Sequence, residues 1–162
     1  MPDLPDMDTL KANSKLFALL DEVGREKLLA VGVEVEHPDG DLLGTRGEQS
    51  DAFFLVLEGA VSVYVEGDTK LVEVTRLERG SFFGELATLL GEKRAAFAKA
   101  RGDVRALRFD TAKVALVMRK YPKVMESLVR IGIKRSEKNL DGMLRHDFSD
   151  MPVTVAEDPH ER

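Results

Sequence analysis

Gly80-Ser-Phe-Phe-Gly-Glu-Leu-Ala-Thr-Leu-Leu-Gly-Glu-Lys-Arg-Ala-Ala-Phe-Ala-Lys-Ala100 is the most informative segment of this sequence, because its parts fit an anion-binding site. Gly80, Gly84 and Gly91 let the backbone turn tightly and approach a ligand closely, since no Cβ stands in the way. The residues between Gly84 and Gly91 suffice for about one and a half helical turns. The first amides of such a helix have no partners within it and lie at the positive end of its dipole, so they predict a phosphate ligand.

Two charged residues extend this interpretation. Arg94 follows the predicted helix, and its planar fork of donors matches the oxygens of a phosphate two at a time. Glu85 stands at the start of the helix, where a carboxylate favours the helix dipole but would repel a phosphate at close range. We therefore expect Glu85 to face another part of the ligand, such as a sugar hydroxyl whose proton it can accept.

Two motifs in this segment together resemble the phosphate-binding cassette of cyclic nucleotide-binding domains: Phe83-Gly84-Glu85-Leu86-Ala87 and Arg94-Ala95-Ala96. That family includes catabolite activators, regulatory subunits of cAMP-dependent protein kinase and cyclic-nucleotide-gated channels. The resemblance implies that Glu85 takes the ribose 2′-hydroxyl, that Arg94 pairs with the cyclic phosphate, and that the amides of Gly84 and Ala95 add donors. Members that favour cGMP often carry Thr directly after the Arg, so Ala95 favours cAMP.

Length, charge and composition exclude several other classes of protein. A chain of 162 residues with no Cys predicts one domain without disulfides or zinc–thiolate sites. A net charge of −5 argues against a nucleic-acid-binding protein as a whole. The apolar runs are far shorter than the roughly 20 residues of a membrane helix, and the acidic, proline-broken start is unlike a secretory signal. We therefore expect no membrane span and a cytoplasmic location.

The N-terminal half predicts helices followed by short strands. After a loose leader (1–9), helical spacing covers 10–23, with Asn13 or Ser14 as a cap and Gly24 as the break. A second helix is expected over 25–31, closed by Gly32. The period then changes to two, which predicts strands at 33–36, 53–57, 61–66 and 70–75.

The strand patterns also predict which faces are buried. The run 53–57 is almost wholly apolar, so we expect it to be buried on both faces and to end at Glu58-Gly59. In 61–66 the valines alternate with Ser62 and Tyr64, which predicts one solvent-facing side. Short, evenly spaced strands with glycine turns are typical of a β jelly-roll barrel. The predicted class is therefore α+β: a jelly roll with N-terminal helices, a short cassette helix and C-terminal helices.

The C-terminal part predicts two strands and two helices. Strands are expected at 97–101 and 104–109 around Gly102-Asp103, then a helix from Asp110 to Lys120. A last helix is expected from Pro122 to Arg145, interrupted at Gly132. The predicted domain is 10–145, and 146–162 is an acidic tail too short for a helix-turn-helix. We therefore expect no DNA-binding domain in this chain.

We expect the last helix to transmit the binding of the ligand to a partner. In the family this helix moves over the bound base and often pairs with a second subunit, and Leu128, Ile131 and Arg135 are the candidate lid or seam. Its apolar positions hold no clean heptad, so a homodimer and another protein partner both stay open. Tyr121 could stack on a base, although packing is its commoner role. Ala98 could line the base pocket, where its small size would leave the base less well packed.

These observations favour a regulatory module in which cAMP, or alternatively cGMP, changes the population of two positions of the last helix. One alternative is a barrel scaffold that binds no nucleotide and acts through protein contacts alone. Another is a cupin-like metal enzyme. We assign no catalytic residue, metal ligand or cofactor, because His37, His146 and His160 are scattered without zinc spacing and no phosphate-loop or nucleophile-elbow motif is present.

Overall fold

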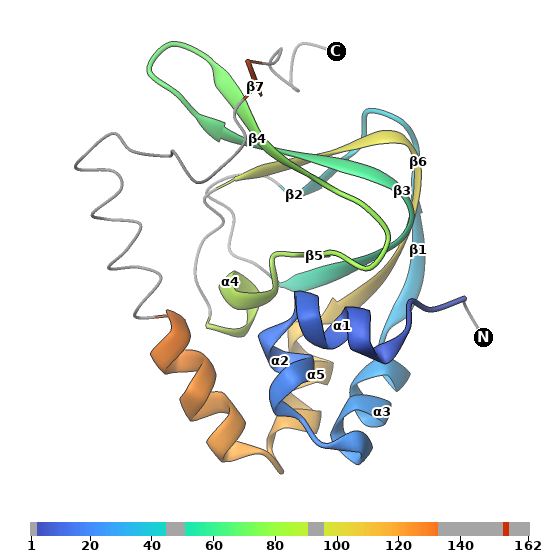
Figure 1. Cartoon of the computed structure of the whole chain (residues 1–162), viewed down its shortest axis with the longest axis vertical. Helices are drawn as coiled ribbons and strands as arrows, with labels where there is room; N and C mark the ends of the chain where they lie inside the picture. The colour runs from blue at the N-terminus through green and yellow to red at the C-terminus, as the bar shows by residue number, and fades with distance from the viewer. Residues whose placement is uncertain (1–2, 45–50, 91–95, 133–153, 156–162) are drawn as a thin grey trace.

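The computed structural model describes residues 3–44, 51–90, 96–132 and 154–155. Its strands are β1 Val33–His37, β2 Leu42–Gly44, β3 Ala52–Glu66, β4 Leu71–Leu77, β5 Phe82–Phe83, β6 Phe97–Asp110 and β7 Thr154–Val155. They form one antiparallel sheet in the order β1-β6-β3-β4-β7, with β2 on β6 and β5 on β3. Most of the helices gather at one end of this sheet (Figure 1). The arrangement confirms the predicted α+β jelly-roll fold.

The two long strands, β3 and β6, pair along most of their length. The predicted break at Glu58-Gly59 is wrong, because β3 continues through it with shifts of register on both sides of Glu58. The predicted break at Gly102-Asp103 is wrong as well, since β6 is one strand. Gly59 and Gly102 have φ values of 88° and 74°. A positive φ, which glycine adopts freely, lets a strand bulge and bend without leaving the sheet.

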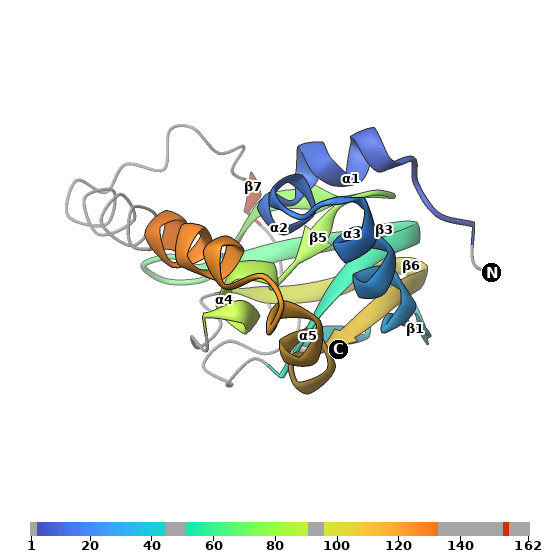
Figure 2. The ribbon, with the colours of Figure 1, turned by 90° about the horizontal axis from the view of Figure 1, so that it is seen from below.

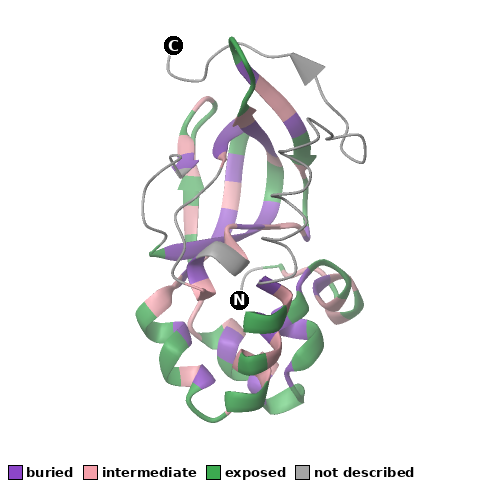
Figure 3. Ribbon diagram, turned by 90° about the vertical axis from the view of Figure 1, so that its left-hand side faces the viewer, coloured by how far each residue is buried: buried purple, intermediate pink, exposed green. Residues whose placement is uncertain are grey.

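The first half of β3 separates two hydrophobic cores, and the predicted burial of 53–57 on both faces is confirmed. Side chains alternate between the faces of a strand, so Phe53 and Leu55 pack toward the helices while Phe54 and Val56 pack inside the barrel. Figure 3 shows the buried stretches along the strands. The helix-side core comprises Leu10, Leu16, Phe17, Leu20, Leu28, Phe53, Leu55, Leu57, Leu107, Phe109, Val114, Met118 and Leu128. The barrel core comprises Leu43, Phe54, Val56, Val61, Val63, Val74, Phe83, Ala98, Ala100, Val104 and Ala106.

The second half of β3 does not have the solvent-facing side that its alternation predicted. Ser62 and Tyr64 are 0% and 1% exposed. Arg101 satisfies both hydroxyl groups, because its Nε donates to Ser62 Oγ at 2.9 Å and its Nη2 donates to the Tyr64 hydroxyl. Tyr64 also packs with Leu71 and Phe97 in a small cluster of its own. Polar side chains that have hydrogen-bond partners can be buried at little cost. The polarity of Ser62 and Tyr64 was therefore not enough to predict that this face of the strand is exposed.

Three helices, rather than the predicted two, precede the sheet: α1 Met7–Asn13, α2 Lys15–Leu19 and α3 Glu22–Ala30. Asp6 caps α1, so the predicted loose leader is wrong at its end. Ser14 caps α2 by accepting a hydrogen bond from Phe17 N at 3.1 Å, as predicted. Asp21 caps α3, and Gly24 lies inside that helix instead of breaking the chain. The caps, which offer acceptors to unpaired amides, set the boundaries here.

Within residues 111–132, two helices follow β6. Helix α5 spans Thr111–Met118. Asp110 stands at its N-cap as predicted, but its carboxylate binds Arg108 and makes no capping hydrogen bond. The next helix begins at Pro122 as predicted and is described to residue 132. Gly132 is helical, and the remainder of the predicted helix, to Arg145, lies outside the described residues.

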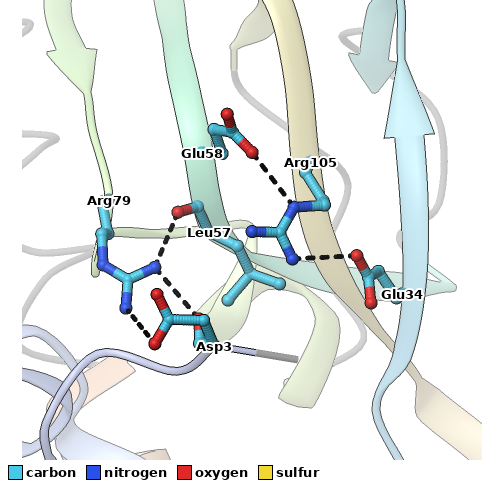
Figure 4. A network of polar contacts seen from close by, with 6 residues as sticks. All are labelled: Asp3, Glu34, Leu57, Glu58, Arg79 and Arg105. Carbon is cyan, nitrogen blue, oxygen red and sulfur yellow. Dashed lines mark hydrogen bonds and ion pairs between the residues drawn. The ribbon is translucent and has the colours of Figure 1, made fainter. Parts of the chain in front are cut away.

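Polar contacts tie the bulge of β3 to its surroundings (Figure 4). Arg105 on β6 donates to Glu58 and to Glu34, at 3.2 and 2.9 Å. Arg79 donates to the carbonyl oxygens of Leu57 and Asp3, at 2.9 and 3.0 Å. The bulge is therefore connected to β1, β6 and the N-terminal segment.

Candidate functional site

The glycine-rich segment forms a strand, a turn and a short helix at the edge of the barrel. Strand β5 pairs with β3, and Gly84 follows it with a φ of 81°. Helix α4, Glu85–Leu89, then begins at the predicted position. Thr88, which is 1% exposed, holds this helix to β3, because its Oγ1 donates to the carbonyl oxygen of Ala52 at 2.9 Å. The cassette helix is thus tied to a strand that contributes to both cores.

Phe83 and the two small residues Ala96 and Ala98 face the inside of the barrel beside the cassette. Phe83 and Ala98 belong to the barrel core, and Ala96 is partly buried against it. Phe97 faces the opposite side of β6, where it packs with Tyr64. Ala98 therefore faces the interior of the barrel and Phe97 does not. The alternation of β6 places these two neighbouring residues on opposite faces of the strand.

The carboxylate of Glu85 faces the N-terminal helices. Its Oε2 accepts a hydrogen bond from the hydroxyl of Ser14, at the junction of α1 and α2. The neighbouring Asn13 donates from Nδ2 to the carbonyl oxygen of Gly80 at 2.8 Å. This junction therefore holds both ends of the segment 80–85. The sequence indicated Ser14 only as a helix cap, and its contact with Glu85, 71 residues away, carries no local signal.

Several predicted site residues cannot be placed. The side chains of Leu86 and Ala87, together with Arg94, Ala95 and Arg135, lie outside the part of the chain that the structure describes. Leu128 is buried in the helix-side core, and Ile131 packs against that core. The lid role of Leu128, Ile131 and Arg135 stays a prediction.

The last helix lies beside α4 (Figures 1 and 2). Gly132 is buried there, and a Cβ added to it would lie 2.2 Å from Cδ1 of Leu90, the residue directly after α4. The cassette and the last helix therefore touch, and a larger side chain at Gly132 would require the side chain of Leu90 to shift. The sequence offered Gly132 only as a helix break.

Tyr121 holds the start of the last helix to α3. Its hydroxyl donates to Asp21 Oδ1 at 2.9 Å, and its ring lies over Gly24, where a Cβ would meet it at 2.9 Å. The backbone amide of Gly24 and then the Tyr121 hydroxyl lower the pKa of Asp21. The hydrogen bond to Asp21 raises the pKa of Tyr121. Tyr121 therefore packs against α3 in this structure.

In the described part of the chain, no three His, Asp or Glu side chains stand close enough together to hold a metal ion. None of the helices in residues 3–44, 51–90 and 96–132 is long and apolar enough to cross a membrane.

Known proteins share this architecture. The profile of the cyclic nucleotide-binding domain family matches residues 34–121. The crystal structure of the N-terminal domain of a transcriptional regulator from Streptomyces coelicolor A3(2) is 27% identical, with a TM-score of 0.65 over 83% of this chain and 96% of that one.

Two further solved structures share the fold at lower identity. The catabolite activator protein of Thermus thermophilus is 22% identical, with a TM-score of 0.66 over 82% of this chain and 62% of that one. The sensor domain of the transcriptional regulator DNR from Pseudomonas aeruginosa is 20% identical, with a TM-score of 0.65 over 83% of this chain and 91% of that one.

Proposed function

This chain belongs to the cyclic nucleotide-binding domain family, and we propose that it is a regulatory module that binds cAMP and signals through its last helix. The observation that carries the proposal is the geometry at Gly84. This residue joins β5 to α4 with a positive φ, beside a barrel interior lined by Ala96 and Ala98. A backbone without Cβ at that point leaves its amide open to a close ligand.

In the proposed complex, the ligand spans the cassette. The cyclic phosphate pairs with Arg94 and accepts hydrogen bonds from the amides of Gly84 and Ala95. The ribose 2′-hydroxyl donates to Glu85, and the base enters the barrel toward Ala98. Members of the family that favour cGMP often carry Thr where this chain has Ala95, which supports cAMP over cGMP. The side chains of Phe83, Leu86, Ala87 and Ala96 complete the proposed cassette.

The last helix is the proposed output. The close contact between Leu90 and Gly132 supports this part of the proposal, because a displaced cassette must move Leu90 against the helix. Leu128, Ile131 and Arg135 would form the lid or the seam to a second subunit or another protein partner. A ligand that contacts two positions of this helix unequally shifts their populations. We place the module in the cytoplasm.

One observation favours the scaffold alternative. The carboxylate of Glu85 already binds Ser14 in this arrangement, so the group proposed to receive the ribose has a partner inside the chain. In a scaffold without nucleotide binding, that contact would be a permanent tie between the cassette and the N-terminal helices.

Calorimetric titration of the purified chain with cAMP and with cGMP tests the proposal. We expect saturable binding of cAMP and at least a tenfold loss of affinity in Arg94→Ala, because hydrogen bonds to charged groups contribute about 1.5–3 kcal/mol and 1.4 kcal/mol is tenfold. The matched control is Arg119→Ala, which removes an exposed arginine at the end of α5. Equal affinity in the parent and in Arg94→Ala would exclude this binding mode, and no binding of either nucleotide would favour the scaffold.

A further inference from the structure

We propose that Ser14 sets the affinity of the nucleotide site by competing with the ribose for Glu85. In the chain without ligand the Ser14 hydroxyl holds the carboxylate, and a ribose hydroxyl must displace it. The inference rests on the proposed function, since it assumes that Glu85 is the ribose acceptor. Ser14, which lies outside the cassette, then decides how tightly the site binds.

The hydroxyl group of Ser14 is both a donor and an acceptor in this structure. Its hydroxyl has a single proton, which it donates to Glu85 Oε2, and its oxygen accepts from Phe17 N at 3.1 Å. Ser14 is 1% exposed, so water cannot readily replace Glu85 as its acceptor. Breaking the contact leaves a buried donor without its strongest partner, and this penalty opposes ligand binding.

The direction of the contact makes Ser14 a competitor instead of a support. Ser14 lies between α1 and α2, whose buried residues Leu16 and Phe17 belong to the helix-side core. The proposed pocket lies toward the barrel core, to which Phe83 and Ala98 belong. In the proposed competition, the carboxylate turns toward the barrel to receive a ribose hydroxyl and releases Ser14 as it turns.

Asn13 provides a matched control within the same junction. It also ties the junction to the segment 80–85, but its partner is the backbone carbonyl of Gly80 and not a group assigned to the ligand. Removing the Asn13 side chain therefore loosens the junction without freeing Glu85. A general effect of a looser junction and a specific effect on Glu85 can be separated in this way.

The test compares the affinity for cAMP of the parent, Ser14→Gly and Asn13→Ala by calorimetric titration. Glycine is a fair N-cap, so Ser14→Gly removes the competing hydroxyl and largely keeps the start of α2. We expect cAMP to bind Ser14→Gly about tenfold more tightly, as fits a hydrogen bond to a charged group, and Asn13→Ala within about twofold of the parent. Unchanged or weaker binding by Ser14→Gly, or equal tightening in both variants, would overturn the proposal.

A measurement without ligand separates this failure from a failure of the proposed function. Urea unfolding of Ser14→Ala, Glu85→Gln and the double variant gives their coupling, which we expect to be clearly favourable. Binding by the parent with no gain in Ser14→Gly refutes the competition and leaves the function standing. No binding by the parent or by Ser14→Gly refutes the function and the competition together, and a favourable coupling then identifies the contact as purely structural. If Ser14→Gly bound cAMP and the parent did not, both the proposed function and the competition would be supported.

Discussion

Replacing Gly59 by Ala tests the bulge that lets β3 bend between the two halves of the barrel. An added Cβ would lie 2.4 Å from the backbone carbonyl oxygen of Asp103 and 3.2 Å from Cα of Val104. The φ of 88° costs a residue with a side chain about 1–2 kcal/mol. Overpacking against main-chain atoms adds about 1–3 kcal/mol, so we expect Gly59→Ala to lower the free energy of unfolding by about 2–5 kcal/mol.

Gly102→Ala is the matched control for this prediction. Gly102 has a similar φ of 74°, but nothing lies within 4 Å of its added Cβ. Gly102→Ala should therefore lower the free energy of unfolding only by the cost of its positive φ, about 1–2 kcal/mol. Urea unfolding followed by far-ultraviolet circular dichroism measures both variants, and equal slopes in urea would show that the unfolded states are comparable. If Gly59→Ala were no less stable than Gly102→Ala, the close approach to Asp103 would not limit the bulge.

Three further outcomes can be measured in the same way. Thr88→Val should lose about 1 kcal/mol, because the hydroxyl that binds β3 is gone, whereas a retained stability would show that this bond does not anchor α4. Gly132→Ala forces the end of the Leu90 side chain to shift, so it should cost about 1 kcal/mol more in the parent than in Leu90→Ala, and additive effects of the two substitutions would contradict the contact. The lowered pKa of Asp21 means that its stabilising contribution is present above about pH 4 and is lost as the pH falls through its folded-state pKa. Asp21→Asn should therefore flatten the loss of stability below about pH 4, and an unchanged acid profile would refute this assignment.

The elements that the sequence predicted well are those with a local physical signal. The cassette helix begins at Glu85 because a glycine turn precedes it, and 53–57 is buried on both faces because its side chains are nearly all apolar. Ser14 was predicted as a cap because its hydroxyl can serve the next turn. Each of these depends on residues within a few positions of one another.

The predictions that failed depend on residues far apart in the chain. Gly59 looks like the end of a strand, but pairing with β6 carries β3 through it. Ser62 looks exposed, yet Arg101 reaches it from the neighbouring strand. Ser14 was predicted as a candidate helix cap and Glu85 as the start of the cassette helix. Their contact was not predicted, because only the packing of the helices on the barrel brings the two residues together.

The pairing of β3 with β6 also has a consequence for the order of folding. Tyr64 pairs with Phe97 at one end of this ladder and Ala52 pairs with Asp110 at the other, so the ladder closes a loop that contains β4, β5 and α4. Closing such a loop costs chain entropy before any distant contact forms. The walls of the barrel beside the cassette, Phe83 from inside the loop and Ala98 from β6, meet only when the loop is closed. The binding competence of this chain should therefore appear late in refolding, together with the ladder.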